Sequence, residues 1–219
     1  MTPRDPPAQP PDSVDLRVLG AAAGQCRACD LAGPATQTVF GDGPRDARMV
    51  LVGEQPGDDE DRKGKPFVGP AGRLLDKALV AAGITRSDTY LTNAVKHFRF
   101  ERAERGRHPK ARLHKSPTTT QVRICYPWLR AELRAVQPDV VVALGATAAK
   151  ALYGPTFRIT ESRGQLLDLQ AGSGSVTFLA TTHPSAVLRA DDRERAFAAL
   201  VDDLSVAAQA MPTRSKPRR

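Results

Sequence analysis

The stretch RMVLVGEQPG at residues 48–57 decides the fold, because a short run of aliphatic and β-branched residues leads directly into a polar turn. A run of this length and composition predicts a strand that is buried on both faces. Runs of the same character follow at residues 89–95 (TYLTNAV), 140–144 (VVVAL) and 176–182 (VTFLATT). The sequence therefore predicts four buried strands.

Helical patterns lie between these runs, at residues 72–82, 118–136, 146–152 and 193–207. Threonines at the start of residues 118–136 can cap that helix. Strands that alternate with helices indicate a parallel sheet covered on both faces. We predict an α/β fold, a three-layer sandwich with a central four-stranded parallel sheet flanked by helices. Residues 99–117 are too charged and broken for an element and are predicted to be a long loop.

The length of 219 residues suits one domain with short tails. Residues 1–13 are Pro-rich and are expected to be disordered, residues 14–208 to form the domain, and residues 209–219 to be a basic tail. No apolar run is long enough to span a bilayer, and the first residues lack the apolar core of a signal peptide. We expect a cytoplasmic monomer, since no heptad pattern is visible.

Positive charge is concentrated in one segment. The chain carries a net charge of +8, and residues 96–115 contain eight Lys or Arg and two Glu. This density suits contact with the phosphates of a nucleic acid, although a solvated charged loop would read the same way. The candidates for phosphate contact are Lys96, Arg107, Lys110, Arg112 and Lys115.

Polar residues follow the predicted strands at the points where the strands end. Glu54 and Gln55 come after the first strand, Asn93 closes the second, and His183 and Ser185 follow the last. In open parallel α/β sheets, ligands bind beyond the carboxyl ends of the strands. The pattern therefore predicts one shared site. A P-loop is excluded, because the Gly and Lys residues near position 64 have the wrong spacing and no GK[ST] is present.

The three cysteines indicate a metal rather than a disulfide framework. Cys26 and Cys29 form a C-x-x-C pair that follows a helical segment, and Cys125 stands far away. A thioredoxin-like redox pair would instead follow a strand and begin a helix. The position of the pair therefore favours metal ligation by the cysteines.

These motifs together resemble the uracil-DNA glycosylase superfamily, in particular its iron–sulfur branch. The matching segments run in order from about residue 26 to about residue 204: GEQPG (53–57), GKPFVGPAGRLLD (64–76), TNAVK (92–96) and HPSAVLR (183–189). The resemblance implies a DNA repair glycosylase that acts on uracil-containing DNA, with single-stranded DNA expected first and double-stranded DNA as the alternative. A base inside a duplex has to be flipped out before it can be attacked.

The resemblance also implies roles for individual residues. Phe67 would stack on the flipped base, Asn93 would read uracil through its amide, and Gly53 belongs to the same binding motif. His183 would stabilise the uracil anion, and Glu54 would act on the sugar cation or on water. Ser185 and Arg189 of the last motif join the candidates for DNA contact.

Two departures narrow the match. The hydrolytic iron–sulfur members usually have Ala where Gln55 stands and Cys where His97 stands. Together with the long basic insert ending in ARLHKSP (111–117), these departures resemble the X-type (UdgX-like) glycosylases. In that group a histidine of the insert, here His114, attacks the sugar C1′ and stays bonded to it, which makes the enzyme single-turnover. Glu54, Gln55 or a water that they bind would take the imidazole proton.

The resemblance further implies a [4Fe–4S] cluster held by Cys26, Cys29, His97 and Cys125. Zinc is the alternative, because a Cys₃His set is common at zinc sites. Two other functions stay open at this stage. An ordinary hydrolytic uracil-DNA glycosylase would share the pocket and release an abasic site. A non-catalytic, metal-stabilised DNA-binding module would need only the basic segment, and Glu54, Asn93 and His183 argue against it.

Overall fold

A computed structural model describes residues 9–103, 111–171 and 174–212 of the chain. The central sheet has five strands in the order β2-β1-β5-β7-β6. Its strands are β1 (Met49–Gly53), β2 (Thr89–Asn93), β5 (Val140–Leu144), β6 (Leu166–Ala171) and β7 (Gly174–Thr181). The four predicted strands pair in parallel, which confirms that part of the prediction.

The fifth strand corrects the prediction of a four-stranded sheet. Strand β6 pairs antiparallel with β7 and lies at the edge of the sheet. Its sequence, LLDLQA, includes Asp168 and Gln170, and Leu166 is 46% exposed. An edge strand with polar side chains lacks the continuous apolar run that identified the buried strands.

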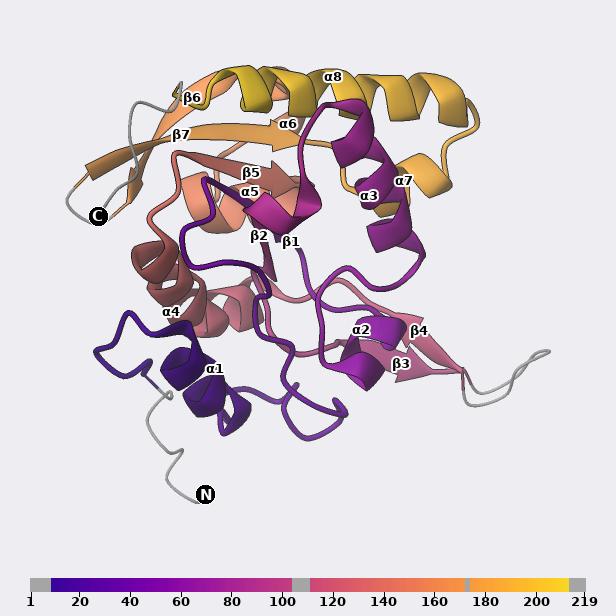
Figure 1. The fold of residues 1–219 in the computed structure, drawn as a ribbon. Helices are drawn as coiled ribbons and strands as arrows, with labels where there is room; N and C mark the ends of the chain where they lie inside the picture. The colour runs from indigo at the N-terminus through magenta and orange to yellow at the C-terminus, as the bar shows by residue number, and fades with distance from the viewer. Residues whose placement is uncertain (1–8, 104–110, 172–173, 213–219) are drawn as a thin grey trace.

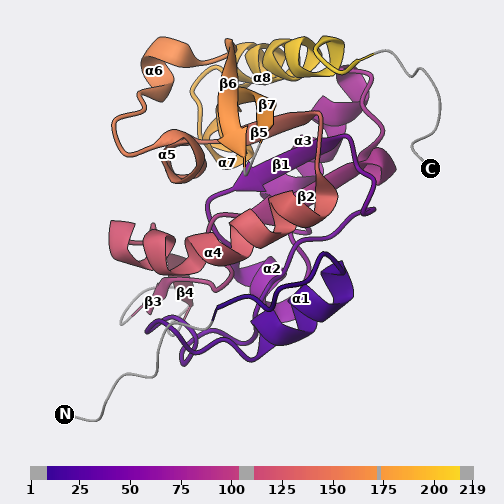
Figure 2. The same cartoon turned by 90° about the vertical axis from the view of Figure 1, so that its left-hand side faces the viewer.

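Helices cover both faces of the sheet, which makes three layers (Figures 1 and 2). One face packs against α3 (Pro70–Ala81), α7 (Pro184–Leu188) and α8 (Arg193–Gln209), and the other against α4 (Thr119–Val136) and α5 (Ala146–Tyr153). The strands serve the two layers alternately: Met49 and Leu51 lie in one core cluster, Val50 and Val52 in the other. Thr118 caps α4, as predicted.

The remaining elements lie around the sheet. Helix α1 (Leu16–Gly24) packs on α4, and short helices α2 (Asp58–Lys63), α6 (Ile159–Ser162) and a 3₁₀ turn η1 (Arg86–Asp88) connect the strands. None of the helices in these described segments is long and apolar enough to cross a membrane.

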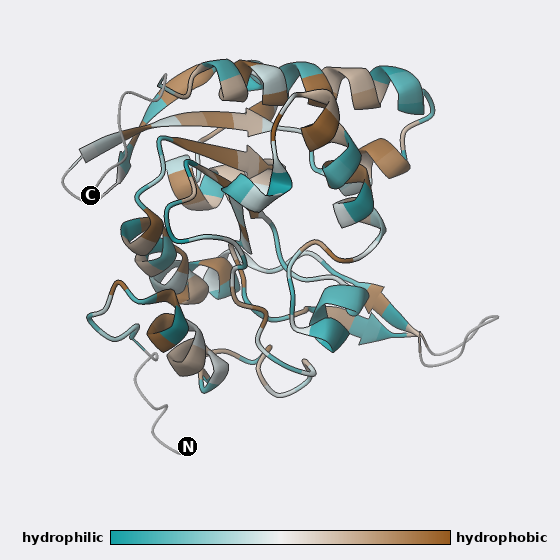
Figure 3. Ribbon diagram, viewed as in Figure 1, coloured by the Kyte–Doolittle hydropathy of each residue, from teal (hydrophilic) through white to brown (hydrophobic). Residues whose placement is uncertain are grey.

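The predicted loop at 99–117 contains a hairpin instead. Strands β3 (Phe100–Arg102) and β4 (Arg112–His114) pair antiparallel beside α2 (Figure 1). Both strands have just three residues, and the hairpin and α2 are mostly hydrophilic (Figure 3). Periodicity in sequence detects a buried stripe, and this hairpin has none, which explains the missed prediction.

Candidate active site

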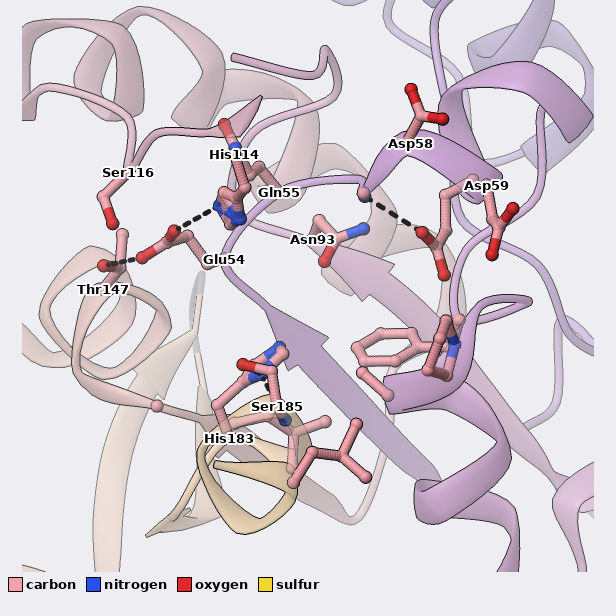
Figure 4. A pocket seen from close by; sticks show the side chains of 18 of the residues that line it. Glu54, Gln55, Asp58, Asp59, Asn93, His114, Ser116, Thr147, His183 and Ser185 are labelled. Atoms are coloured by element: carbon pink, nitrogen blue, oxygen red, sulfur yellow. Dashed lines mark hydrogen bonds and ion pairs between the residues drawn. The ribbon is translucent and has the colours of Figure 1, made fainter. Parts of the chain in front are cut away.

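One pocket of about 760 Å³ lies at the carboxyl ends of the parallel strands. The predicted site residues that line it are Glu54, Gln55, Phe67, Asn93, His114, His183, Ser185 and Arg189. The strand-end pattern correctly predicted that the polar residues meet. That pattern did not predict the position of His114, because His114 lies on β4 of the hairpin and not at the end of a strand of the central sheet (Figure 4).

The wall of the pocket near Asn93 depends on a missing side chain. A Cβ at Gly53 would lie 2.4 Å from Asn93 Oδ1 and 2.7 Å from Phe67 Cζ. Gly53 therefore lets the Phe67 ring approach the Asn93 amide, which explains a glycine at the end of a buried strand. Phe67 has a positive φ of 55°, an uncommon backbone conformation for a bulky residue that the surrounding structure has to hold in place.

Glu60 supplies part of that support, and sequence reasoning missed it. Its carboxylate accepts a hydrogen bond from Gly57 N–H at 3.0 Å and another from Gly69 N–H at 2.7 Å. It thus joins the turn after β1 to the loop that carries Phe67. A glutamate three residues after the N-cap residue of a helix is a known capping signal, and Glu60 stands at that position after Gly57.

Glu54 connects His114 to the pocket. Its Oε1 lies 3.2 Å from His114 Nε2, and its Oε2 accepts the Thr147 hydroxyl at 2.5 Å. Burial lowers the pKa of His114, against the opposing effect of Glu54 and together with that of Arg189. The imidazole is therefore neutral at neutral pH and can act as a nucleophile. Thr147, also missed, follows the end of β5, a strand end that the same pattern rule covers.

His183 is fixed in one tautomer. Its Nδ1 accepts the Ser185 backbone N–H at 3.1 Å and caps α7, so the hydrogen of the neutral ring must be on Nε2. Burial lowers the pKa of His183 to about 4, with smaller contributions from Arg189 and His114. A neutral ring with an Nε2–H donor is the form that can stabilise a developing anion in the pocket.

Gln55 holds the base of the hairpin, which corrects its predicted role as a proton acceptor. Its amide nitrogen donates to the carbonyls of Arg99 and Lys115 at 3.2 and 3.0 Å. Its amide oxygen accepts the Arg99 N–H at 3.1 Å. Both polar atoms of this buried amide thus bind the backbone of Arg99, directly before β3, or of Lys115, directly after β4. Gln55 is a positioning residue for the strand that carries His114.

Arg112 holds the hairpin from the other side, which corrects its prediction as a phosphate contact. Its side chain is 8% exposed, pairs with Asp61 at 2.5 Å and makes a second ion pair with Asp58. The guanidinium also lies over the rings of Phe98 and Phe100, at 5.4 and 5.0 Å from their centroids. An arginine committed to two carboxylates and two rings is not available to DNA.

Lys96 is also not a DNA contact, which corrects the prediction for this residue. Its side chain is 1% exposed, and its ammonium lies 2.5 Å from Glu132. The same ammonium donates to Thr92 Oγ1 and to the Asn93 carbonyl at 2.6 and 2.8 Å. Charge counting along the sequence cannot separate a surface lysine from a buried one, because the partner Glu132 lies on α4, far along the chain.

The other predicted DNA contacts are placed as follows. Lys115 is half exposed and pairs with Glu101 at 3.0 Å. Ser185 and Arg189 line the pocket, and Arg189 is exposed. Arg107 and Lys110 lie outside the described residues. Of these residues, Arg189 brings exposed positive charge to the pocket.

The three cysteines belong to one buried cluster. Cys26 and Cys125 pack with Ala23, Leu31, Val95 and Trp128, and Cys29 lies against them. Burial raises the pKa of the Cys125 thiol to about 12, against the opposing effect of Lys96 and with a small contribution from the other two cysteines. Within residues 9–103, 111–171 and 174–212, no three His, Cys, Asp or Glu side chains converge on a point that would hold a single metal ion.

The ring of His97 is held beside this cluster by Thr38. The Thr38 hydroxyl donates to the Ala23 carbonyl at 3.2 Å, so at its oxygen it accepts the His97 Nε2–H at 2.9 Å. This leaves the lone pair on Nδ1, and burial lowers the pKa of the ring so that it is neutral. A second hydrogen bond that fixes the tautomer is typical of metal-binding histidines.

Comparison with known proteins shows the family to which the chain is similar. Residues 40–205 match the family model described as the uracil DNA glycosylase superfamily. The chain is 38% identical to the type-4 uracil-DNA glycosylase of Thermotoga maritima, over 80% of this chain and 83% of the relative. It is also 38% identical to that of Archaeoglobus fulgidus, over 74% and 78%, and 34% identical to that of Pyrobaculum aerophilum, over 80% and 86%.

Proposed function

The chain belongs to the uracil DNA glycosylase superfamily, and from this premise we propose that it excises uracil from DNA and then binds the deoxyribose covalently through His114. The observation that carries the proposal is the contact between Glu54 and His114 at 3.2 Å, in the same pocket as Phe67, Asn93 and His183. The substrate would be a flipped nucleotide of single-stranded DNA, with double-stranded DNA as the second candidate.

The base would be held by three side chains. The Phe67 ring would stack on the uracil plane. The Asn93 amide offers one donor and one acceptor, which match O4 and N3–H of uracil and mismatch cytosine. The neutral His183 would donate its Nε2–H to O2 as the glycosidic bond breaks and negative charge develops on the base.

The sugar would be attacked from the side of Glu54. Departure of uracil leaves an oxocarbenium-like deoxyribose, and the Glu54 carboxylate, oriented by Thr147, would stabilise it. One nitrogen of the neutral His114 ring would bond to C1′, and Glu54 would accept the proton from the imidazolium that forms. The product is a neutral N-alkyl imidazole, which is a poor leaving group, so the adduct would be durable.

An ordinary hydrolytic glycosylase is the second candidate, and it fits the names of the type-4 relatives equally well. In that case Glu54 would activate water, and His114 would only contact DNA. The contact of His114 with Glu54 favours the covalent reaction. The strand that carries His114 is also held in place by both Gln55 and Arg112. A strand that only contacted phosphates would not need two buried anchors.

The residues of the cysteine cluster fit a [4Fe–4S] cluster. Cys26, Cys29 and Cys125 would supply three thiolates and His97 its Nδ1. Each ligand of such a cluster binds a different iron atom, so the ligands need not converge on one point as they do around zinc. The group would stabilise the packing of the N-terminal segment on α4 and would take no part in the chemistry of the base or the sugar.

The covalent step can be tested with labelled single-stranded DNA that carries one uracil. Protein and DNA are mixed, heated in SDS and run on a denaturing gel, with His114→Ala and a thymine-containing DNA alongside and a hot-alkali lane for abasic sites. We expect an SDS-resistant band with the wild-type protein and uracil only. Alkali-labile DNA without that band would establish the hydrolytic enzyme instead. The absence of both signals would reject glycosylase activity.

A further inference from the structure

Trp128 carries a buried polar group that the protein itself does not satisfy. The side chain is 2% exposed, and across the described part of the chain its Nε1 is the buried side-chain nitrogen or oxygen that has no hydrogen-bond partner. An indole N–H can only donate. A buried donor that is left unpaired destabilises the folded protein, so such a group points to a partner of another kind.

The surroundings of Trp128 identify what that partner is made of. Trp128 packs in the same cluster as Cys26 and Cys125, and it follows Cys125 by three residues on α4, which puts both on one face of the helix. A donor already points at this sulfur: the Lys96 backbone N–H lies 3.2 Å from Cys125 Sγ. The unpaired indole therefore belongs to the group of packed side chains that contains the three cysteine sulfurs.

We propose that Trp128 donates its indole N–H to a sulfur of the iron–sulfur cluster and thereby tunes its reduction potential. This inference rests on the iron–sulfur part of the proposed function. An inorganic sulfide is an additional acceptor, whereas a zinc ion adds none, so the unpaired donor favours iron–sulfur over zinc. Hydrogen bonds to cluster sulfurs stabilise the more negative, reduced form and so raise the potential.

The test compares Trp128→Phe, which keeps an aromatic ring and removes the donor, with Val122→Ala as the matched control. Val122 packs against the same buried side chains as Trp128 and carries no polar group, so its truncation changes packing alone. The midpoint potential of each cluster-loaded protein is measured by redox titration. We expect a more negative potential in W128F and no change in V122A. An unchanged potential in W128F, or an equal shift in both variants, would overturn the proposal.

A second measurement keeps the proposal testable if W128F does not hold the cluster. Trp128 is the one tryptophan of the chain, so labelling with ¹⁵N at the indole gives a single NMR signal. In the loaded wild-type protein we expect this signal to be displaced by the paramagnetic iron. A signal that does not move when the cluster is removed would overturn the proposal, as would purified protein that contains zinc without sulfide. Uracil excision by such a zinc protein would leave the glycosylase function standing, so the two failures are distinguishable.

Discussion

Replacing Gln55 with Met should divert the reaction from the covalent adduct to the abasic site. The side chain makes three hydrogen bonds to the backbone of Arg99 and Lys115, at 3.0–3.2 Å. At about 1 kcal/mol for each bond, their loss weakens the docking of the hairpin by about 3 kcal/mol. A free-energy change of about 1.4 kcal/mol changes an equilibrium constant tenfold, so the docked population of His114 falls by up to roughly 100-fold relative to the undocked one. The ion pairs of Arg112 keep the real loss below this bound.

The assay measures two products of one reaction, which makes it independent of the fraction of folded protein. The SDS-resistant band reports the adduct, alkali cleavage reports the abasic site, and their ratio is compared between variants. Glu101→Gln is the matched control, since it removes an exposed ion pair of the same hairpin that contributes little. A ratio in Q55M equal to that of the wild type and of E101Q would refute the reasoning.

Three further predictions concern polar side chains with defined partners. Lys96→Met should lower the free energy of unfolding by about 3–5 kcal/mol in urea titrations, because the buried Glu132 would lose its counter-charge. The double variant with Glu132→Gln, which keeps an acceptor for Tyr90 and Thr92, should recover part of this loss, and equal stability of single and double variants would contradict the reasoning. The pKa of His183, about 4 in the folded protein against about 6.5 unfolded, means that the unfolded state binds the extra proton between these values. Stability should therefore fall by up to about 3 kcal/mol as pH drops from about 6.5 to about 4, a slope that should be smaller in His183→Asn. Thr147→Val should slow adduct formation about tenfold by releasing Glu54, with rescue by Thr147→Ser, and single-turnover rates would decide it.

The buried ion pair of Lys96 and Glu132 links the parts of the molecule that the function combines. The Lys96 ammonium holds the Asn93 carbonyl, while the Lys96 backbone N–H lies against Cys125. Glu132 also accepts from the hydroxyls of Tyr90 and Thr92. The turn that presents Asn93 to the base is thus fastened both to the sheet and to the helix that carries Cys125.

The sequence by itself determined the four parallel strands, the helices that cover them and the meeting of Glu54, Asn93 and His183 at the strand ends. Burial on both faces leaves continuous apolar runs, and a parallel sheet brings the ends of its strands to one edge. Both are local signals with a fixed geometric consequence. The edge strand β6 and the hairpin of β3 and β4 leave no such signal.

Only the tertiary structure decided what each charged or polar side chain does. In the sequence, Lys96 and Arg112 cannot be told from a lysine or arginine on the surface. In the folded protein they stabilise the structure, because Glu132 lies opposite Lys96 and Asp58 and Asp61 lie opposite Arg112. The role of a polar group depends on its partner and its exposure to water, because an ion pair that is weak in water is strongly held once it is buried. Partners brought together from distant parts of the chain exist only after folding.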